Sequence, residues 1–147
     1  MTNHEENALS LDSQLCFALY SAQLAMNKLY RGLLGELGLT YPQYLVMLVL
    51  WESDHRSVSE IGEQLFLDSA TLTPLLKRLE KAELLSRRRS REDERRVDVE
   101  LTERGRALHD KAASIPEAVT CASHCSPAEM ASLRDQLHKL RRELGSS

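Results

Sequence analysis

Residues 55–85, HRSVSEIGEQLFLDSATLTPLLKRLEKAELL, have the pattern of two short helices joined by a tight corner. Ser57 or Ser59 is placed to cap the first helix, and Asp68 or Ser69 is placed to cap the second. The second helix turns four leucines inward at helical spacing, namely Leu72, Leu75, Leu76 and Leu79. One face of this helix therefore packs against a core, and another face is free to contact a partner.

The chain changes to a strand pattern directly after these helices. LLSRRRS (84–90) resembles a strand, REDER (91–95) forms a charged tip, and RVDVELT (96–102) alternates between apolar and polar residues. Val97, Val99 and Leu101 face one way, and Asp98 and Glu100 face the other. The pattern predicts a β-hairpin. Two capped helices followed by a basic hairpin are typical of a winged helix-turn-helix, whose second helix fits the major groove of DNA and whose hairpin, the wing, reaches the minor groove.

Two groups of side chains are candidates for DNA contacts. We expect base-edge contacts from Ser69, Thr71 and Thr73, and phosphate or minor-groove contacts from Lys77, Arg78, Arg88, Arg91, Arg95 and Arg96. Phosphate contacts raise affinity without selecting a base sequence. A solvated loop is the alternative interpretation of such a charge run, and its position directly behind the two helices favours the wing.

Helical patterns also precede this region. Apolar residues recur at helical spacing over 12–37, and Gly35 and Gly38 end this first helix. Thr40 is placed as the N-cap of a second helix, with Pro42 in its first turn. Because this second helix is apolar on every side, we expect it to be buried.

Helical patterns resume after the hairpin. We expect one helix over 102–125 and a last one over 126–144, in which Ser126 is the N-cap, Pro127 the first helical residue and Glu129 the third. The predicted order is four helices, a hairpin and two helices. The fold class is therefore mostly α (α+β).

The length, composition and net charge of the chain restrict the classes of protein to which it can belong. The chain has 147 residues, 42% of them apolar and 28% charged, with a net charge of −3, which fits one domain over 1–147. The acidic start MTNHEENALS lacks the features of a signal peptide, and no stretch is long and apolar enough to span a membrane. We therefore expect a cytoplasmic protein. Three cysteines in a reducing compartment do not indicate a disulfide framework.

Residues 93–105, DERRVDVELTERG, resemble the wing and following helix of the multiple-antibiotic-resistance regulator (MarR) family of winged-helix repressors. The resemblance implies that the side chains of Asp93 and Arg95 pair, so that Asp93 supports Arg95 and holds it toward the minor groove. It also implies a homodimer that covers an inverted-repeat operator in double-stranded DNA. Residues 12–38 and 102–145 would supply the dimerisation helices, and residues 41–101 the DNA-binding region.

LCFALYSA (15–22), followed by NKLY (27–30) and LTYPQYLVML (39–48), resembles more narrowly the organic hydroperoxide resistance regulators within that family. The resemblance implies that organic hydroperoxides oxidise Cys16 to a sulfenic acid. It also implies that Tyr30 and Tyr41 of the partner subunit bond to the reduced thiol.

The residues around Cys16 support a sensing role on their own. Cys16 lies near the start of a helix capped by Asp12 or Ser10, where unpaired N–H groups favour a thiolate, although the charge of Asp12 opposes this. Cys16, Tyr20, Gln23, Asn27 and Tyr30 form a polar and aromatic stripe. Its two ends are roughly 21 Å apart along a straight helix, so Cys16 and Tyr30 meet only across a dimer. The alternative interpretation of Cys16 is a small buried hydrophobe.

TCASHC (120–125) holds the other two cysteines. The resemblance is to family members in which a second cysteine resolves the sulfenic acid as a disulfide, and it favours Cys121 for this role, with Cys125 as the alternative. Cys121, His124 and Cys125 also offer zinc ligands at close spacing. We expect no metal and no cofactor.

The leading hypothesis is a repressor that is released from DNA when organic hydroperoxide oxidises Cys16. One alternative is a repressor that binds a phenolic effector and whose cysteines are passive. Another is a thiol peroxidase, but the sequence has no arginine or threonine constellation beside Cys16 and no βαβ pattern. We therefore expect that the protein is not an enzyme.

Overall fold

The computed structural model describes residues 8–145, so most of the acidic start of the chain lies outside the described residues. The elements in order are η1 (Leu11–Ser13), α2 (Leu15–Gly35), α3 (Tyr41–Glu52), β1 (Arg56–Ser57), α4 (Val58–Leu65), α5 (Ser69–Lys81), β2 (Leu85–Arg89), β3 (Val97–Leu101), α6 (Glu103–Ala112), α7 (Ile115–Ser123) and α8 (Pro127–Gly145). The chain divides between Asp110 and Lys111 into two compact units. No helix in the described part is long and apolar enough to cross a membrane.

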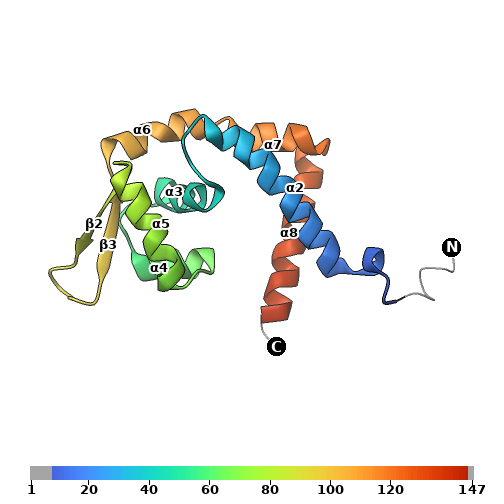
Figure 1. Ribbon diagram of the computed structural model, residues 1–147, viewed down its shortest axis with the longest axis horizontal. Coiled ribbons are helices and arrows are strands. Elements are labelled where there is room, and N and C mark those ends of the chain that lie inside the picture. Colours follow the sequence, from blue (N-terminus) through green and yellow to red (C-terminus); the bar gives the residue numbers. More distant parts are fainter. Residues whose placement is uncertain (1–7, 146–147) are drawn as a thin grey trace. The chain divides into compact units, whose positions relative to one another are not determined.

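The first unit is a winged helix-turn-helix. α3, α4 and α5 pack together, and β2 and β3 extend beside them as a hairpin (Figure 1). The core contains Val46, Met47, Ile61, Leu72 and Leu76, each at most 1% exposed. The mostly α (α+β) class and the winged helix-turn-helix are therefore confirmed.

The predicted helix ends in this unit are confirmed by their hydrogen bonds. Thr40 and Ser57 each form a capping box, with Gln43 and Glu60 respectively, and the Asp68 carboxylate accepts a bond from the backbone N–H of Thr71. These side chains satisfy N–H groups that have no partner inside the helix. The start of α5, which carries the candidate base contacts, is set by this cap.

The sheet has one strand more than the hairpin that the sequence predicts. Its order is β1-β3-β2, with Arg56 opposite Val99 and Ser57 opposite Asp98. β1 is only two residues long, too short for its alternation to be recognised in the sequence. It ties the base of the wing to the start of α4.

The corner between α4 and α5 depends on close backbone contact. Phe66 lies in the left-handed region with φ +59°, and the N–H of Leu67 donates to the carbonyl of Gly62. A Cβ at Gly62 would lie 2.7 Å from the carbonyl oxygen of Leu67. Only glycine therefore allows the chain to fold back this tightly.

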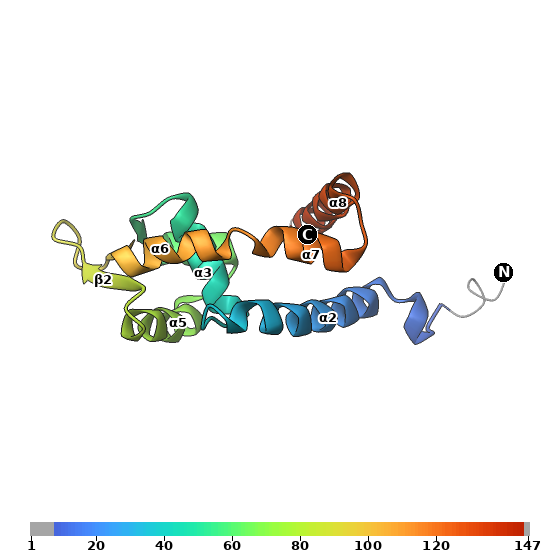
Figure 2. The same cartoon turned by 90° about the horizontal axis from the view of Figure 1, so that it is seen from above.

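The first helix begins later than the sequence predicts. Asp12 lies in η1, and the N-cap of α2 is Gln14, whose side chain makes no capping bond. The first helix therefore has neither Ser10 nor Asp12 as its cap. In both views the N-terminal part of α2 extends beyond α3, α5 and α6 of its unit (Figure 1 and Figure 2).

The predicted helix over 102–125 is wrong as a single element. It is divided into α6 and α7, with a break after Ala112. Pro116 lies in the first turn of α7. Proline has no N–H to bond the carbonyl four residues earlier and its ring clashes with that carbonyl, so the helix ends and a new one begins.

The second unit contains α7 and α8. The predicted cap of α8 is confirmed, because Ser126 and Glu129 exchange backbone-to-side-chain hydrogen bonds of 3.0 and 3.1 Å. α7 ends at Ser123, and His124 lies in the left-handed region. The sequence predicts that Cys125 lies one helical turn beyond Cys121 on the same helix. In the structure Cys125 lies in the loop before α8 instead.

Candidate DNA-binding surface and redox site

A cavity of about 600 Å³ separates the start of α5 from the wing. It is lined by side chains from β1, α4, α5 and the hairpin, namely Ser57, Val58, Ser59, Ser69, Thr73, Arg87, Asp93, Arg95, Arg96 and Val97. The fold thus brings the predicted base-contact residues Ser69 and Thr73 beside the predicted wing residue Arg95. These residues are far apart in the sequence.

The other candidate DNA contacts are also accessible. Ser69, Thr71, Lys77 and Arg78 are exposed on α5, and Thr73 is half-buried. Arg88, Arg91, Arg95 and Arg96 are exposed on the wing. The inward-facing leucines of α5 are buried, except Leu75, which is half-buried. The face of α5 opposite the core is therefore available, as the periodicity predicts.

The wing tip is held by hydrogen bonds within the chain. The N–H groups of Glu92 and Asp93 donate to Ser90 Oγ, and the N–H of Arg96 donates to the carbonyl of Asp93. Asp93 Oδ1 accepts a bond of 3.0 Å from the backbone N–H of Arg95. Asp93 therefore supports the Arg95 backbone, whereas the resemblance implies a pairing of the two side chains. Among residues 8–145 the Arg95 guanidinium has no hydrogen-bond or ion-pair partner.

Two wing arginines are already engaged. Arg87 donates from Nε and Nη2 to Glu80 Oε1 at 3.2 and 3.0 Å, and its N–H donates to Glu80 Oε2. Arg96 donates to Asp98 at 2.7 Å and to Glu60 at 3.2 Å. The sequence analysis did not identify Glu60 and Glu80, because pairs separated by 36 and 7 residues give no periodic signal.

Cys16 is an exposed free thiol at the second residue of α2. The buried-hydrophobe alternative for Cys16 finds no support in this exposure. The first turn of α2 contains no acidic residue and has no side-chain cap. The first N–H groups of α2 therefore have no side-chain acceptor at the N-cap.

The other two thiols belong to the second unit. Cys121 is exposed on α7 and Cys125 is half-buried in the following loop. The N–H of Cys125 donates to Ser123 Oγ, and its thiol lies 3.6 Å from the carbonyl of Ser123. Within residues 8–145 no three His, Cys, Asp or Glu side chains form a group that could hold a metal ion. The zinc alternative at Cys121, His124 and Cys125 thus gains no support.

Tyr30 and Tyr41 lie together, with ring centroids 4.8 Å apart. The structure adds Tyr44, which the sequence analysis did not select, at 5.9 Å from Tyr30 and 6.4 Å from Tyr41. Burial, together with the neighbouring Tyr41 and Tyr44, raises the pKa of Tyr30 to about 12. This ring therefore keeps its phenolic proton, which it can donate. Tyr20 is exposed and does not join the cluster.

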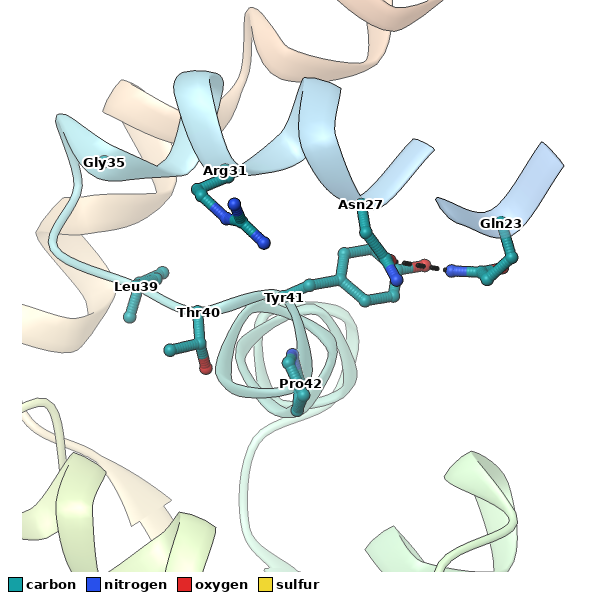
Figure 3. A pocket seen from close by; sticks show the side chains of 8 residues that line it. All are labelled: Gln23, Asn27, Arg31, Gly35, Leu39, Thr40, Tyr41 and Pro42. Carbon is teal, nitrogen blue, oxygen red and sulfur yellow. Dashed lines mark hydrogen bonds between the residues drawn. The ribbon is translucent and has the colours of Figure 1, made fainter. Parts of the chain in front are cut away.

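A second cavity, of about 580 Å³, lies between α2 and the start of α3. Its lining consists of Gln23, Asn27, Arg31, Gly35, Leu39, Thr40, Tyr41 and Pro42. Figure 3 shows Arg31 extending from α2 toward the Thr40–Tyr41 segment, and Gln23 bonded to Asn27 at 2.9 Å. Two residues of the predicted polar stripe on α2, Gln23 and Asn27, thus line this cavity.

Comparison with known proteins identifies the family. Residues 28–112 match the family described as Transcriptional regulator SarA/Rot. The chain belongs to the SarA/Rot family of transcriptional regulators. The SarA/Rot match spans the C-terminal part of α2, the whole winged helix-turn-helix and α6.

Individual relatives of this SarA/Rot chain extend over nearly all of it. It is 53% identical over 135 residues to the regulator TtmR of Methylorubrum extorquens, covering 92% of this chain and 69% of that protein. It is 47% identical to the organic hydroperoxide resistance transcriptional regulator of Bacillus subtilis, covering 90% of each. The structure of AbfR of Staphylococcus epidermidis matches with a TM-score of 0.79 and 31% identity over the whole of both chains. The resemblance to organic hydroperoxide resistance regulators is confirmed.

Proposed function

We propose that the protein is a transcriptional repressor that senses organic hydroperoxides and binds an inverted-repeat DNA operator as a reduced homodimer. The observation that carries the proposal is the exposed Cys16 at the uncapped start of α2, in a chain that also presents Arg95 beside the start of α5. The name of the Bacillus subtilis relative supports the inducer. Related structures describe AbfR bound to DNA in reduced and overoxidised forms and AbfR with a disulfide formed.

The cavity between α5 and the wing is the proposed DNA-binding surface. The start of α5 would enter the major groove, where the hydroxyls of Ser69, Thr71 and Thr73 can bond to base edges. The Arg95 guanidinium, which has no partner among the described residues, would enter the adjacent minor groove. Lys77, Arg78, Arg88 and Arg91 would neutralise phosphates.

A homodimer would cover apolar surface that the single chain exposes. Leu15 and Leu24 of α2 are 60% and 52% exposed, and Leu133 of α8 is 51% exposed. Leucines at this exposure on long helices favour association with another helical surface, because burying them removes apolar area from water. A two-fold dimer presents two α5 helices, which matches an inverted repeat.

The sensing step is an oxidation of sulfur. The Cys16 thiolate attacks the terminal oxygen of the hydroperoxide, the O–O bond breaks, and the alkoxide leaves as the alcohol after taking a proton. Sulfur becomes a sulfenic acid and the hydroperoxide is reduced. The phenols of Tyr30 and Tyr41 from a second copy would donate to the reduced thiolate. The Tyr30 proton is available for this because the Tyr30 pKa is about 12.

The second step locks the oxidised state. A Cys121 thiolate from a second copy attacks the sulfenic sulfur, an S–S bond forms, and the hydroxyl leaves as water. Cys121 is favoured because it is exposed, whereas Cys125 is half-buried and held by Ser123. A bond from α2 to α7 would displace the helices that carry the α5 pair and break its register with the operator.

A gel-shift experiment on the duplex upstream of the protein's own gene tests this function. Reduced wild-type protein should retard the duplex, and cumene hydroperoxide should release it, whereas Cys16→Ser should stay bound. Cys125→Ser is the matched control and should respond as wild type. A Cys16→Ser protein that is still released by hydroperoxide would refute the proposed mechanism.

A second candidate function is supported by the cavity between α2 and α3. A phenolic effector could pack on Tyr41 and accept a hydrogen bond from Arg31, and so move α2 relative to α3 without any thiol chemistry. This candidate predicts that salicylate or a related phenol releases DNA equally from wild type and from Cys16→Ser. Release that requires Cys16 would exclude it.

The amount of hydroperoxide consumed per subunit distinguishes a thiol peroxidase from a sensor. A sensor consumes about one hydroperoxide per thiol, because its oxidation is the signal. Consumption of many equivalents per subunit in the presence of a thiol reductant would show an enzyme instead.

A further inference from the structure

One ion-pair cluster joins the wing to α4. Glu60 Oε1 accepts bonds from the Ser57 N–H at 2.9 Å and from Arg96 Nη2 at 3.2 Å, and Glu60 Oε2 lies 3.5 Å from Arg56. Arg96 Nε donates to Asp98 at 2.7 Å. Arg96 thus bridges a carboxylate on α4 and a carboxylate on β3.

The cluster lies where the wing leaves the rest of the sheet. The outermost pair between β1 and β3 is Ser57 with Asp98, and the outermost pair within the hairpin is Arg89 with Val97. Arg96 is the next residue toward the tip. Its carbonyl accepts a bond of 2.8 Å from the N–H of Ser90, so the hairpin is still paired at this residue, and its contact with Glu60 ties the hairpin to α4 beyond the end of the β1–β3 ladder.

We propose that Arg96 is a positioning residue rather than a phosphate contact, and that Glu60 and Asp98 clamp it so that Arg95 is presented to the DNA minor groove. This inference rests on the proposed DNA-binding function. Arg95 and Arg96 are adjacent in the chain and both line the cavity beside Ser69 and Thr73. One has two carboxylate partners and the other has none among residues 8–145, so the two arginines have different roles.

The direction in which DNA affinity changes when the Glu60 charge is removed shows whether Glu60 holds the wing in place. A carboxylate near a DNA surface repels phosphates, so removal of a bystander carboxylate strengthens binding or leaves it unchanged. Removal of a clamping carboxylate weakens binding, because the wing loses its anchor. The hydrogen bonds from Ser57 lower the pKa of Glu60, and the charges of Arg96 and Arg56 lower it further. Glu60 is therefore ionised at neutral pH.

Glu60→Gln is the sharpest variant, because glutamine also forms capping boxes and keeps the cap of α4 while removing the charge. Glu63→Gln is the matched control: it removes the same charge from an exposed site on the same helix. DNA affinity is measured by fluorescence anisotropy with reduced protein and the duplex upstream of its own gene, at several salt concentrations. Thermal unfolding of each variant verifies that it is folded.

Wild type should bind, Glu60→Gln should bind about three- to tenfold more weakly, and Glu63→Gln should bind at least as well as wild type. Arg96→Gln should weaken DNA binding without changing the slope of log affinity against log salt concentration. The double variant, Glu60→Gln with Arg96→Gln, should have the same affinity as whichever single variant binds DNA less tightly, or a higher one, because both changes remove the same contact. A decrease of about one in that slope for Arg96→Gln would show a phosphate contact and overturn the inference. Unweakened binding by Glu60→Gln would also overturn it, whereas wild type that fails to bind would refute the proposed function itself.

Discussion

Gly105 is the position at which a single methyl group should be most damaging. A Cβ there would lie 2.0 Å from the carbonyl oxygen of Leu84, where real Cβ contacts essentially never fall below 3.0 Å, and 3.2 Å from a methyl carbon of Leu101. The first neighbour is backbone, so no rotamer change relieves the clash. α6 and the start of β2 would have to separate by about 1 Å.

That separation would strain two hydrogen bonds. The Leu84 carbonyl accepts from the N–H of Thr102 at 3.1 Å, and the Gly105 carbonyl accepts from Trp51 Nε1 at 2.9 Å. Overpacking of this kind costs about 1 to 3 kcal/mol, and a hydrogen-bonding group left buried without its partner costs a similar amount. We expect Gly105→Ala to lower the free energy of unfolding by roughly 2 to 4 kcal/mol.

Urea unfolding followed by the fluorescence of Trp51, the single tryptophan, measures this change at the affected contact. Protein concentration is held constant, because the stability of a dimer depends on it. Gly32→Ala is the control: nothing lies within 4 Å of its Cβ position, so stability should stay the same or rise by up to about 1 kcal/mol. A loss below about 0.5 kcal/mol for Gly105→Ala would refute the reasoning, because surface substitutions fall within that range.

Three further predictions concern the caps, the tyrosines and the thiols. Ser57→Ala removes the α4 cap and should lower the free energy of unfolding by about 1 kcal/mol in the same urea assay; an unchanged midpoint would contradict the capping role. Because the Tyr30 pKa is raised from 10.0 to about 12, its contribution to stability is complete below pH 10 and is lost as the pH rises toward 12. Between pH 9.5 and pH 11.5 the free energy of unfolding should fall less for Tyr30→Phe than for wild type, as measured by denaturation at the two pH values. An equal fall in both proteins would count against the raised pKa of Tyr30. After hydroperoxide treatment, non-reducing electrophoresis should show a crosslinked dimer for Cys125→Ser and none for Cys121→Ser; the reverse result would assign resolution to Cys125.

Signals between residues close together in the sequence were sufficient to predict most of the helices and strands of the winged helix-turn-helix. Thr40, Ser57 and Asp68 cap the helices as predicted, since a cap depends on residues three positions apart. The alternation over 97–101 also indicated correctly which side of β3 is buried. Where a local signal was overlooked, the prediction failed: Pro116 interrupts the helix that was expected over 102–125.

Some residues of the candidate sites were also predicted from the sequence, and others were found only in the structure. The motif around Cys16 predicted a sensing thiol, and the structure places that thiol at the exposed start of α2. Its predicted link to Cys121 and the division into dimerisation helices and a DNA-binding region stay predictions, because both require a second copy of the chain. The addition of Tyr44 to Tyr30 and Tyr41 came only from the structure.

The sequence alone determined the caps of α3, α4, α5 and α8 and which faces are apolar, and it selected the candidate residues for thiol and DNA-binding chemistry, because these signals depend on neighbours a few positions apart. Only the tertiary structure decided how the two adjacent arginines of the wing differ. Arg96 is held by Glu60, 36 residues away, while the Arg95 guanidinium has no partner among the described residues. The pairing of distant charges depends on the position of the wing against α4, which results from packing of the whole unit and leaves no pattern in the sequence.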